Sequence, residues 1–96
     1  MENEFSNKPI EIEETEDNIS SLNLSRVVLF NDDWHTFDEV INQLIIAIQC
    51  TFEKARSHAF EVHVKGKSIV FAGNIKDCLK VSSILEEIDL HTQIIS

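Results

Sequence analysis

Residues 25–40, SRVVLFNDDWHTFDEV, contain the clearest structural signals of the chain. The first six of them are mostly apolar and β-branched, which is typical of a short buried strand, and the polar triplet Asn31-Asp32-Asp33 then ends that strand in a turn. Thr36 followed by Glu39 matches the capping box, in which each side chain bonds the main chain of the other residue at a helix start. These residues therefore predict a strand, a turn and a helix in immediate succession.

The rest of the chain continues this alternation of helices and strands. Apolar residues recur at steps of three and four over 36–49, 51–64 and 74–88, which predicts three helices, while 68–72 and 91–96 have the composition of strands. The expected order is β-α-α-β-α-β, an α+β sandwich in which three helices pack on a small three-stranded sheet, antiparallel or mixed. The residues expected to face the core are Phe37, Val40, Ile41, Leu44, Ile45 and Ile48 in the first helix, Phe52, Ala55, Ala59, Val62 and His63 in the second, and Cys78, Val81, Leu85 and Ile88 in the third.

Length and charge describe one acidic domain with an uneven charge distribution. Ninety-six residues allow a single modest core, and the formal net charge is −9. Seven acidic residues against the one lysine, Lys8, give residues 1–25 a charge of −6. We therefore expect a flexible acidic N-terminal extension at 1–24 and a core domain at 25–96. The acidic balance disfavours nucleic acid and acidic membranes as partners.

Other features of the composition predict a cytoplasmic protein. No uncharged stretch reaches the ~20 residues that a membrane span needs, and the start of the chain lacks the apolar segment of a secretory signal. Cys50 and Cys78 lie far apart in apolar surroundings, without the close spacing of a zinc site or a disulfide framework. We expect both cysteines to act as small hydrophobic residues.

The polar turn after the first strand is the main candidate for a functional site, because junctions between elements often carry function. Trp34, the single tryptophan, lies in this turn, and His63 ends an otherwise apolar helix face. If the turn and His63 meet, an amide oxygen, a carboxylate and an imidazole nitrogen surround an apolar hollow. That arrangement suits a free α-amino group next to a large hydrophobic first side chain. The alternative is a turn that caps its own backbone and a histidine packed in the core.

Three segments, Val27–Asp33, Glu53–Ala55 and Val62–Lys67, carry a family resemblance in matching mutual spacing. They resemble the first strand and loop, the second-helix start and the helix-end turn of the ClpS family, small bacterial adaptors that deliver N-degron substrates to the Clp unfoldase and protease. The likeness covers roughly residues 27–96 and is most specific up to Lys67. It implies the same β-α-α-β-α-β fold behind an N-terminal extension, and an adaptor, not an enzyme, with no cofactor and no metal.

The resemblance also implies partners and residue roles. The partner would be the N-terminal domain of an AAA+ unfoldase of the ClpA or ClpC type, the ligands would be N-degron peptides, and we expect a monomer. Position by position, the resemblance implies that the substrate's α-ammonium is held by Asn31, Asp32 and His63, and that the loop is shaped by Asp33, Trp34 and His35. The side-chain pocket would be lined by Phe37, Val40, Cys50 and Ala59 and closed by a residue near Gln93 or Ile94. Docking on the unfoldase would involve Lys76 and Lys80.

Departures from the family pattern bear on specificity. Family members commonly have Tyr-Thr-Pro-Met after the acidic pair, where this chain has Trp34-His35-Thr36-Phe37, so a flexible Met becomes a rigid Phe. His35 adds a hydrogen-bonding group there, and Ala59 replaces another Met of the pocket. Phe narrows one wall and Ala opens another, so the preferred first residue can shift among Leu, Phe, Tyr and Trp.

Other functions stay open at this stage. Asp32, Asp33, His35 and His63 could be drawn as a metal or acid-base site of an enzyme, but no ligand spacing is met and the two cysteines lie in apolar helices. A structural module of similar topology, such as the C-terminal domain of the ribosomal stalk protein, leaves these polar residues without a role. A degenerate ClpS-like domain would dock on a Clp unfoldase and modulate it without binding N-degrons.

Overall fold

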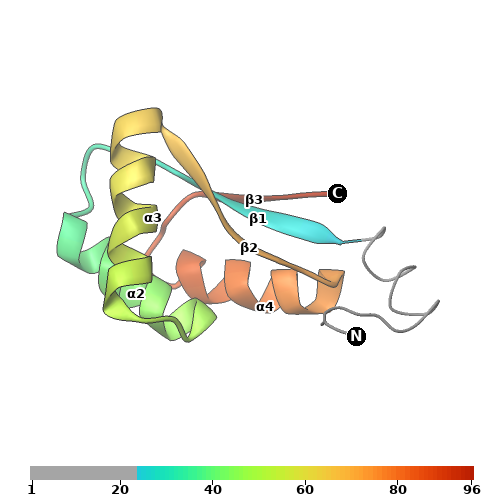
Figure 1. The fold of residues 1–96 in the computed structure, drawn as a ribbon. Helices are drawn as coiled ribbons and strands as arrows, with labels where there is room; N and C mark the ends of the chain where they lie inside the picture. The colour runs from blue at the N-terminus through green and yellow to red at the C-terminus, as the bar shows by residue number, and fades with distance from the viewer. Residues whose placement is uncertain (1–23) are drawn as a thin grey trace, which may run out of the picture.

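The structure is a computed structural model that describes residues 24–96 (Figure 1). The predicted extension at 1–24 lies outside the described residues, apart from Leu24. The elements follow one another in the predicted order, so the predicted fold class is confirmed. They are β1 (Ser25–Phe30), α2 (Phe37–Ile48), α3 (Phe52–Lys65), β2 (Lys67–Gly73), α4 (Ile75–Glu86) and β3 (Thr92–Ile95).

The three strands within residues 24–96 form one antiparallel sheet in the order β2-β1-β3. The central strand β1 is paired along both edges, and its consecutive residues Val27, Val28 and Leu29 are all buried, which agrees with its apolar sequence. Its pairing with β2 shifts register between Val27, opposite Phe71, and Val28, opposite Ile69. Figure 1 shows α4 along one face of the sheet, while α2 and α3 gather at the end where the chain leaves β1. The sequence was compatible with either an antiparallel or a mixed sheet, and the strands of the described residues pair antiparallel.

Each described helix begins at the capping residue that the sequence predicts. The hydroxyl of Thr36 accepts the main-chain N–H of Glu39 at 3.1 Å, and the Glu39 carboxylate accepts the main-chain N–H of Thr36 at 2.8 Å. The side chains of Thr51 and Asn74 accept main-chain N–H groups in the same way at the starts of α3 and α4. The last helix ends at Glu86, two residues earlier than predicted.

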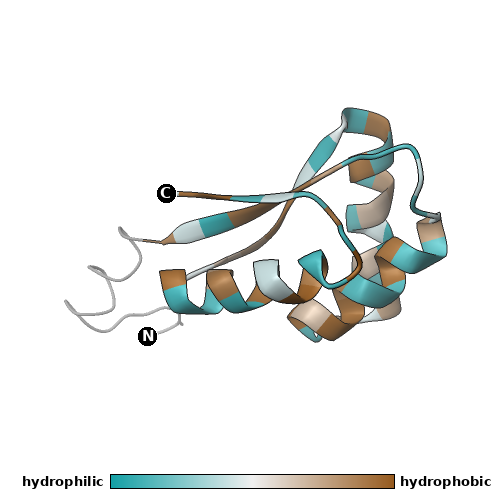
Figure 2. Cartoon of the chain, turned by 180° about the vertical axis from the view of Figure 1, so that it is seen from behind, coloured by the Kyte–Doolittle hydropathy of each residue, from teal (hydrophilic) through white to brown (hydrophobic). Residues whose placement is uncertain are grey.

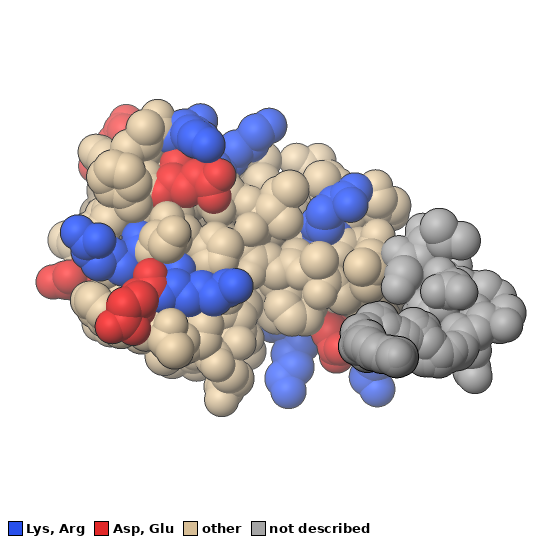
Figure 3. Space-filling view, in the orientation of Figure 1, with Lys and Arg blue, Asp and Glu red and all other residues tan. Residues whose placement is uncertain are grey.

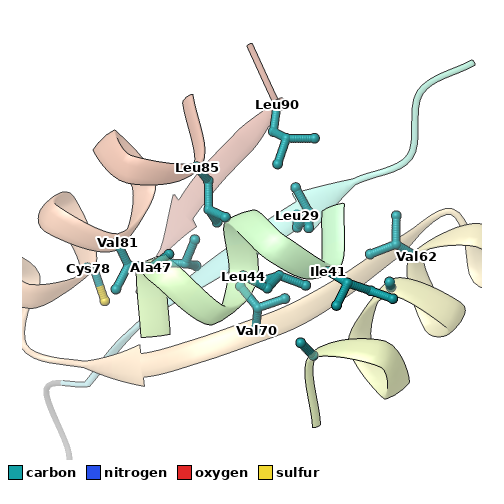
Figure 4. Packing of buried hydrophobic residues seen from close by; sticks show 13 residues of the cluster. Leu29, Ile41, Leu44, Ala47, Val62, Val70, Cys78, Val81, Leu85 and Leu90 are labelled. Atoms are coloured by element: carbon teal, nitrogen blue, oxygen red, sulfur yellow. The ribbon is translucent and has the colours of Figure 1, made fainter. Parts of the chain in front are cut away.

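The core lies between the helices and the face of the sheet that carries Val27 and Leu29 (Figure 4). Leu44 of α2 and Leu85 of α4 belong to the same core cluster as these strand residues and are fully buried. Burying one such side chain stabilises the fold by roughly 1.5–3 kcal/mol. This packing fixes α4 against the sheet and α2 against α3 and α4, and through them the loop that connects β1 to α2.

The buried faces of the helices differ from the predicted stripes near their edges. Gln43 and Ala47 of α2 are buried although neither was predicted, and the Gln43 amide Nε2 donates to the carbonyl oxygen of Ile84 at 2.7 Å. Phe52, in the first turn of α3, is 54% exposed, because helix packing covers that face only from the next turn onward. His63 is exposed too, so the prediction that it ends a core stripe is wrong. Its neighbour Val62 takes the buried position.

The surface of the described domain carries charges of both signs. Figure 3 shows acidic and basic side chains interspersed over the end of the molecule formed by α3. Cys78 is buried and Cys50 is partly buried, and neither forms a disulfide among the described residues. In the part of the chain that the structure describes, no helix has the length and apolar character needed to cross a bilayer.

Candidate functional site

A cavity of about 350 Å³ lies where the loop after β1 meets the start of α2 and the last turns of α3. The fold brings the loop and α3, which are distant in the sequence, together at this cavity. We call residues 31–36 the loop wall, and Phe37, Val40, Ala59, Val62 and His63 the helical wall. The lining residues are Asn31, Asp32, Asp33, His35 and Thr36 from the loop wall, and all five members of the helical wall.

The loop wall is anchored to the ends of two distant elements. The main-chain N–H of Asn31 donates to the carbonyl oxygen of Gly66, directly after α3, at 2.9 Å. At the other end of the loop, Nε2 of His35 lies 2.5 Å from the carbonyl oxygen of Ile88, in the turn after α4. Figure 2 shows the loop as a hydrophilic segment at the edge of the molecule, next to α3. These bonds hold a polar loop in one place over the cavity.

Asp32 makes three hydrogen-bond contacts within the loop wall. Its Oδ1 accepts the main-chain N–H groups of Trp34 at 3.1 Å and His35 at 2.8 Å, and its Oδ2 lies 2.6 Å from Nδ1 of His35. Burial raises the pKa of the Asp32 carboxyl, but the hydrogen bonds from His35 and Trp34 outweigh burial and hold that pKa below its usual range. Asp32 is therefore an ionised carboxylate at neutral pH, with a side chain that is 18% exposed.

His35 is the buried partner of that carboxylate. Its side chain is only 3% exposed, and the ring of Trp34 covers it with the two ring centroids 3.8 Å apart. Burial lowers the pKa of His35, but the hydrogen bonds to Asp32 and to the Ile88 carbonyl outweigh burial and raise that pKa above its usual range. The charges of Asp32 and Glu39 add to the same effect.

The helical wall supplies the apolar part of the cavity. Ala59 and Val62 are buried in the core cluster, and Val40 is partly buried against it. Phe37 remains 38% exposed at the start of α2, and His63 is exposed at the end of the same wall. A ligand side chain in this cavity would lie against hydrocarbon, with the imidazole of His63 and the carboxylate of Asp32 near its polar end.

Most, but not all, of the predicted site residues meet at this cavity. Asn31, Asp32, Asp33, His35, Phe37, Val40, Ala59 and His63 line it. Cys50 does not, because it follows the last turn of α2, whereas Phe37 and the loop wall lie at the first turn, about 18 Å away along a helix of this length. Neither Gln93 nor Ile94 of β3 reaches the cavity, and Trp34 is 64% exposed outside it.

Sequence reasoning missed two lining residues. Thr36 was recognised only as a helix cap and Val62 only as a core residue, yet both also face the cavity. Their positions held a signal, because Thr36 lies between two predicted site residues and Val62 lies one residue before His63. A residue at the edge of a core can bury part of its side chain and present the rest to a ligand.

The remaining predicted residues lie elsewhere. Lys76 and Lys80 are exposed on α4, away from the cavity lining. Lys80 borders another hollow of about 340 Å³, together with residues such as Ile46 and Phe71. Among residues 24–96, no three side chains of His, Cys, Asp or Glu are grouped so that they could hold a metal ion.

A known protein family matches most of the chain. The family described as ATP-dependent Clp protease adaptor protein ClpS matches residues 21–93, which is most of the chain. The chain belongs to the ClpS family. Its members are adaptors of the ATP-dependent Clp protease, as their description says, and the resemblance found in the sequence is confirmed.

The chain is also similar in sequence to part of some eukaryotic ubiquitin ligases. The chain is 42% identical over 53 residues to the E3 ubiquitin-protein ligase ubr-1 of Caenorhabditis elegans, covering 55% of this chain and 3% of the ligase. It is 33% identical over 69 residues to the E3 ubiquitin-protein ligase UBR1 of Homo sapiens, covering 72% of this chain and 4% of the ligase. The ClpS domain described here therefore spans only a small part of these ligases.

A solved structure shares the fold of this ClpS domain. The structure of Agrobacterium tumefaciens ClpS2 bound to L-phenylalaninamide matches with a TM-score of 0.66 and 19% sequence identity, over 75% of this chain and 94% of that chain. At this identity the match shows that the two chains have the same fold.

Proposed function

We propose that this ClpS domain is a non-enzymatic adaptor that binds the N-terminus of N-degron substrates and delivers them to a Clp unfoldase. One observation carries the proposal: a single cavity of about 350 Å³ joins the acidic loop wall to an apolar helical wall. An α-amino group with a large hydrophobic first side chain has the matching chemistry, three N–H donors on one side and hydrocarbon on the other. Binding sites for small ligands have volumes of about 300–1,000 Å³, a range that includes this cavity.

The acceptors for the α-ammonium come from both walls. Asp32 supplies the negative charge, and Asn31 and His63 contribute an amide oxygen and an imidazole nitrogen to the same cavity. Phe37, Val40, Ala59 and Val62 would contact the first side chain. L-Phenylalaninamide, the compound bound to Agrobacterium tumefaciens ClpS2, has the same two parts, a free amino group and a benzyl side chain. This likeness in ligand chemistry supports the assignment of the two walls.

The energetics indicate a binder of moderate affinity. Each charge-assisted hydrogen bond contributes roughly 1.5–3 kcal/mol, and burying one large apolar side chain contributes about 2–3 kcal/mol. Two or three such bonds and this burial, less an association cost of at least ~4 kcal/mol, leave at most about 8 kcal/mol, a micromolar dissociation constant at best. Moderate affinity suits an adaptor, which must release what it delivers.

Delivery requires a second surface for the unfoldase. We propose that Lys76 and Lys80 on α4 take part in docking on the N-terminal domain of a ClpA-type or ClpC-type unfoldase, since both are exposed and away from the cavity. A substrate and an unfoldase could then be held at the same time. A Lys76→Glu, Lys80→Glu double variant should bind free-amino peptides normally but slow their delivery in a reconstituted degradation assay. Unchanged delivery would assign docking to another surface.

A titration with short peptides tests the binding function. The peptides begin with Leu, Phe, Tyr, Trp, Ile or Gly, and each is prepared with a free and with an acetylated amino group. Saturable binding of the first four, only when unacetylated, supports the proposal, because acetylation removes the positive charge and two of the three N–H donors that the acceptors of the cavity would bind. Equal binding of all twelve peptides would exclude it.

The alternative is a degenerate adaptor that docks on the unfoldase without binding N-degrons. One observation favours it: the Asp32 carboxylate already has three hydrogen-bond partners, the main-chain N–H groups of Trp34 and His35 and the His35 ring. If these bonds leave Asp32 unable to accept a ligand, no free-amino peptide will bind. The same titration separates the two functions.

A further inference from the structure

His35 lies between two hydrogen-bond acceptors. Its Nε2 is 2.5 Å from the carbonyl oxygen of Ile88, and because a carbonyl can only accept, Nε2 must carry a hydrogen. Its Nδ1 is 2.6 Å from Oδ2 of Asp32. The other oxygen of Asp32 accepts two main-chain N–H bonds, which favours the ionised carboxylate, again an acceptor only. Both ring nitrogens therefore carry hydrogen, so the His35 ring is an imidazolium ion.

The charged surroundings of His35 favour this state. The ring is almost fully buried, and its nearest charge is the Asp32 carboxylate. Acidic groups predominate on the elements around it, and His63 is the other titratable group of the cavity that can carry a positive charge. The groups concerned are Asp32 and Asp33 in the loop, Glu39 on α2, His63 on α3, and Glu87 and Asp89 on either side of Ile88 after α4.

We infer that His35 is a positioning residue of this site: its imidazolium holds Asp32 in place and competes with the substrate's α-ammonium for the same carboxylate, so that affinity rises as His35 loses its proton. This inference rests on the proposed function, because it concerns the same cavity and the same class of ligand. It also gives a role to the histidine that replaces the Thr common in the family.

The competition follows from the acceptor capacity of Asp32. A carboxylate offers about four lone-pair sites, and the Trp34 N–H, the His35 N–H and the His35 ring occupy three of them. The remaining site can accept one N–H of an α-ammonium. Once it does, two cations share one carboxylate and repel each other. By linkage, binding of the peptide and binding of the proton to His35 must then weaken each other by the same factor.

A pH profile of binding tests the inference. Between about pH 5.5 and pH 7 the peptide's α-amino group, with a pKa near 7.7–8.0, stays an ammonium, so any change in affinity comes from the protein. Because the pKa of His35 is raised, only part of its titration falls in this range, and we expect the affinity of the wild-type protein for a peptide beginning with Phe to rise about two- to fourfold more over it than that of His35→Gln. Every other titratable group is common to both proteins, so the difference between the two profiles isolates His35.

The measurement uses fluorescence anisotropy with a peptide labelled near its C-terminal end. His91→Gln is the matched control, because it removes an exposed histidine outside the cavity lining and should keep the wild-type profile. A second measurement needs no variant. In the wild-type protein, NMR signals of the His35 ring should show both nitrogens protonated at about pH 6. Its pKa should fall when the protein is saturated with the same peptide.

The outcomes separate this inference from the proposed function. If wild-type and His35→Gln bind the peptide with coinciding pH profiles, the role of His35 is overturned while the peptide-binding function stands. A His35 pKa that stays constant or rises on binding overturns it equally. If the wild-type protein binds no free-amino peptide at any pH, the proposed function fails and the competition fails with it.

Discussion

The two walls of the cavity are held in place by different forces. In the loop wall, Asp32 and His35 are fixed by short hydrogen bonds between ionised groups and main chain. In the helical wall, Ala59 and Val62 are fixed by packing in the core cluster. Bonds between ionised groups depend on protonation, whereas a packed wall depends on side-chain volume. Recognition of the amino group and selection of the first side chain should therefore respond to different changes.

The largest effect is expected from removing the charge of the loop wall. Asp32→Asn keeps the size of the side chain and one carbonyl oxygen for the Trp34 and His35 N–H groups, but it leaves the α-ammonium without a counter-charge. Losing a charge-assisted bond and leaving an unpaired buried cation should weaken binding of a Phe-starting peptide about 100-fold or more. Fluorescence anisotropy against the same peptide measures this loss.

The control for this variant is Asp38→Asn, which removes an equal charge from the first turn of α2, outside the cavity lining. It should change the affinity for the peptide by less than about twofold, because the charge of Asp38 is exposed and salt screens its interaction with the ligand. If both variants bind within a few-fold of the wild-type protein, the loop wall does not recognise the amino group by charge.

The next effect is expected from filling the helical wall. Ala59→Met adds a long side chain where the buried alanine meets the cavity, and it restores the residue common in the family. We expect peptides beginning with Trp or Phe to bind about tenfold more weakly, in line with the ~1–3 kcal/mol that overpacking costs, while peptides beginning with Leu lose less. The ratio of the Trp and Leu dissociation constants measures this change. An unchanged ratio would show that first-residue choice does not depend on this wall.

The fold was largely predictable because its signals are local. Each helix start was predicted from a capping residue and the three residues after it, and the structure has a helix after each of these caps, Thr36, Thr51 and Asn74. The end of a stripe is less predictable. Val62 and His63 are neighbours about 100° apart on the helix, and the period of 3.6 residues does not say which of two residues at the edge of a face is covered.

The site was predictable only where the sequence or the resemblance names a residue type at a position. The partners of His35 were not, because its contact with the Ile88 carbonyl joins residues 53 apart, and a main-chain carbonyl leaves no trace in the sequence. Cys50 was misplaced for a similar reason. Its apolar surroundings show that it is partly buried, but which end of α2 carries the cavity is decided by tertiary packing.

A smaller effect is expected on the free energy of unfolding when the pair formed by Asp32 and His35 is broken by a substitution of His35. The pKa of His35 is raised in the folded protein, so its stabilisation is fully present below the unfolded value of about 6.5 and is lost as pH rises through the folded pKa. The lowered pKa of Asp32 keeps its carboxylate ionised across this range. We expect His35→Gln to be less stable than the wild-type protein by about 1–2 kcal/mol near pH 5.5, with the difference shrinking at higher pH.

Urea unfolding at several pH values measures this difference. A difference that stays constant from about pH 5.5 to pH 8.5 would mean that folding leaves the pKa of the His35 ring unchanged. The loop wall would then be held by ordinary hydrogen bonds, and the contrast between the two walls would lose its dependence on pH.

The smallest effect is expected from removing a helix cap, and a comparison of two such caps tests whether the loop wall acts separately from the rest of the fold. Thr36 and Thr51 each accept a main-chain N–H at 3.1 Å, at the starts of α2 and α3, but only Thr36 lines the cavity. Replacing either by Ala should cost about 1 kcal/mol, which lowers the melting temperature of a domain this size by roughly 4–8 °C. Because the Thr36 cap closes the loop wall, only Thr36→Ala should also weaken peptide binding, by about two- to threefold. If Thr51→Ala weakens binding equally, the loss follows from general destabilisation, and the loop wall cannot be treated as a separate part of the site.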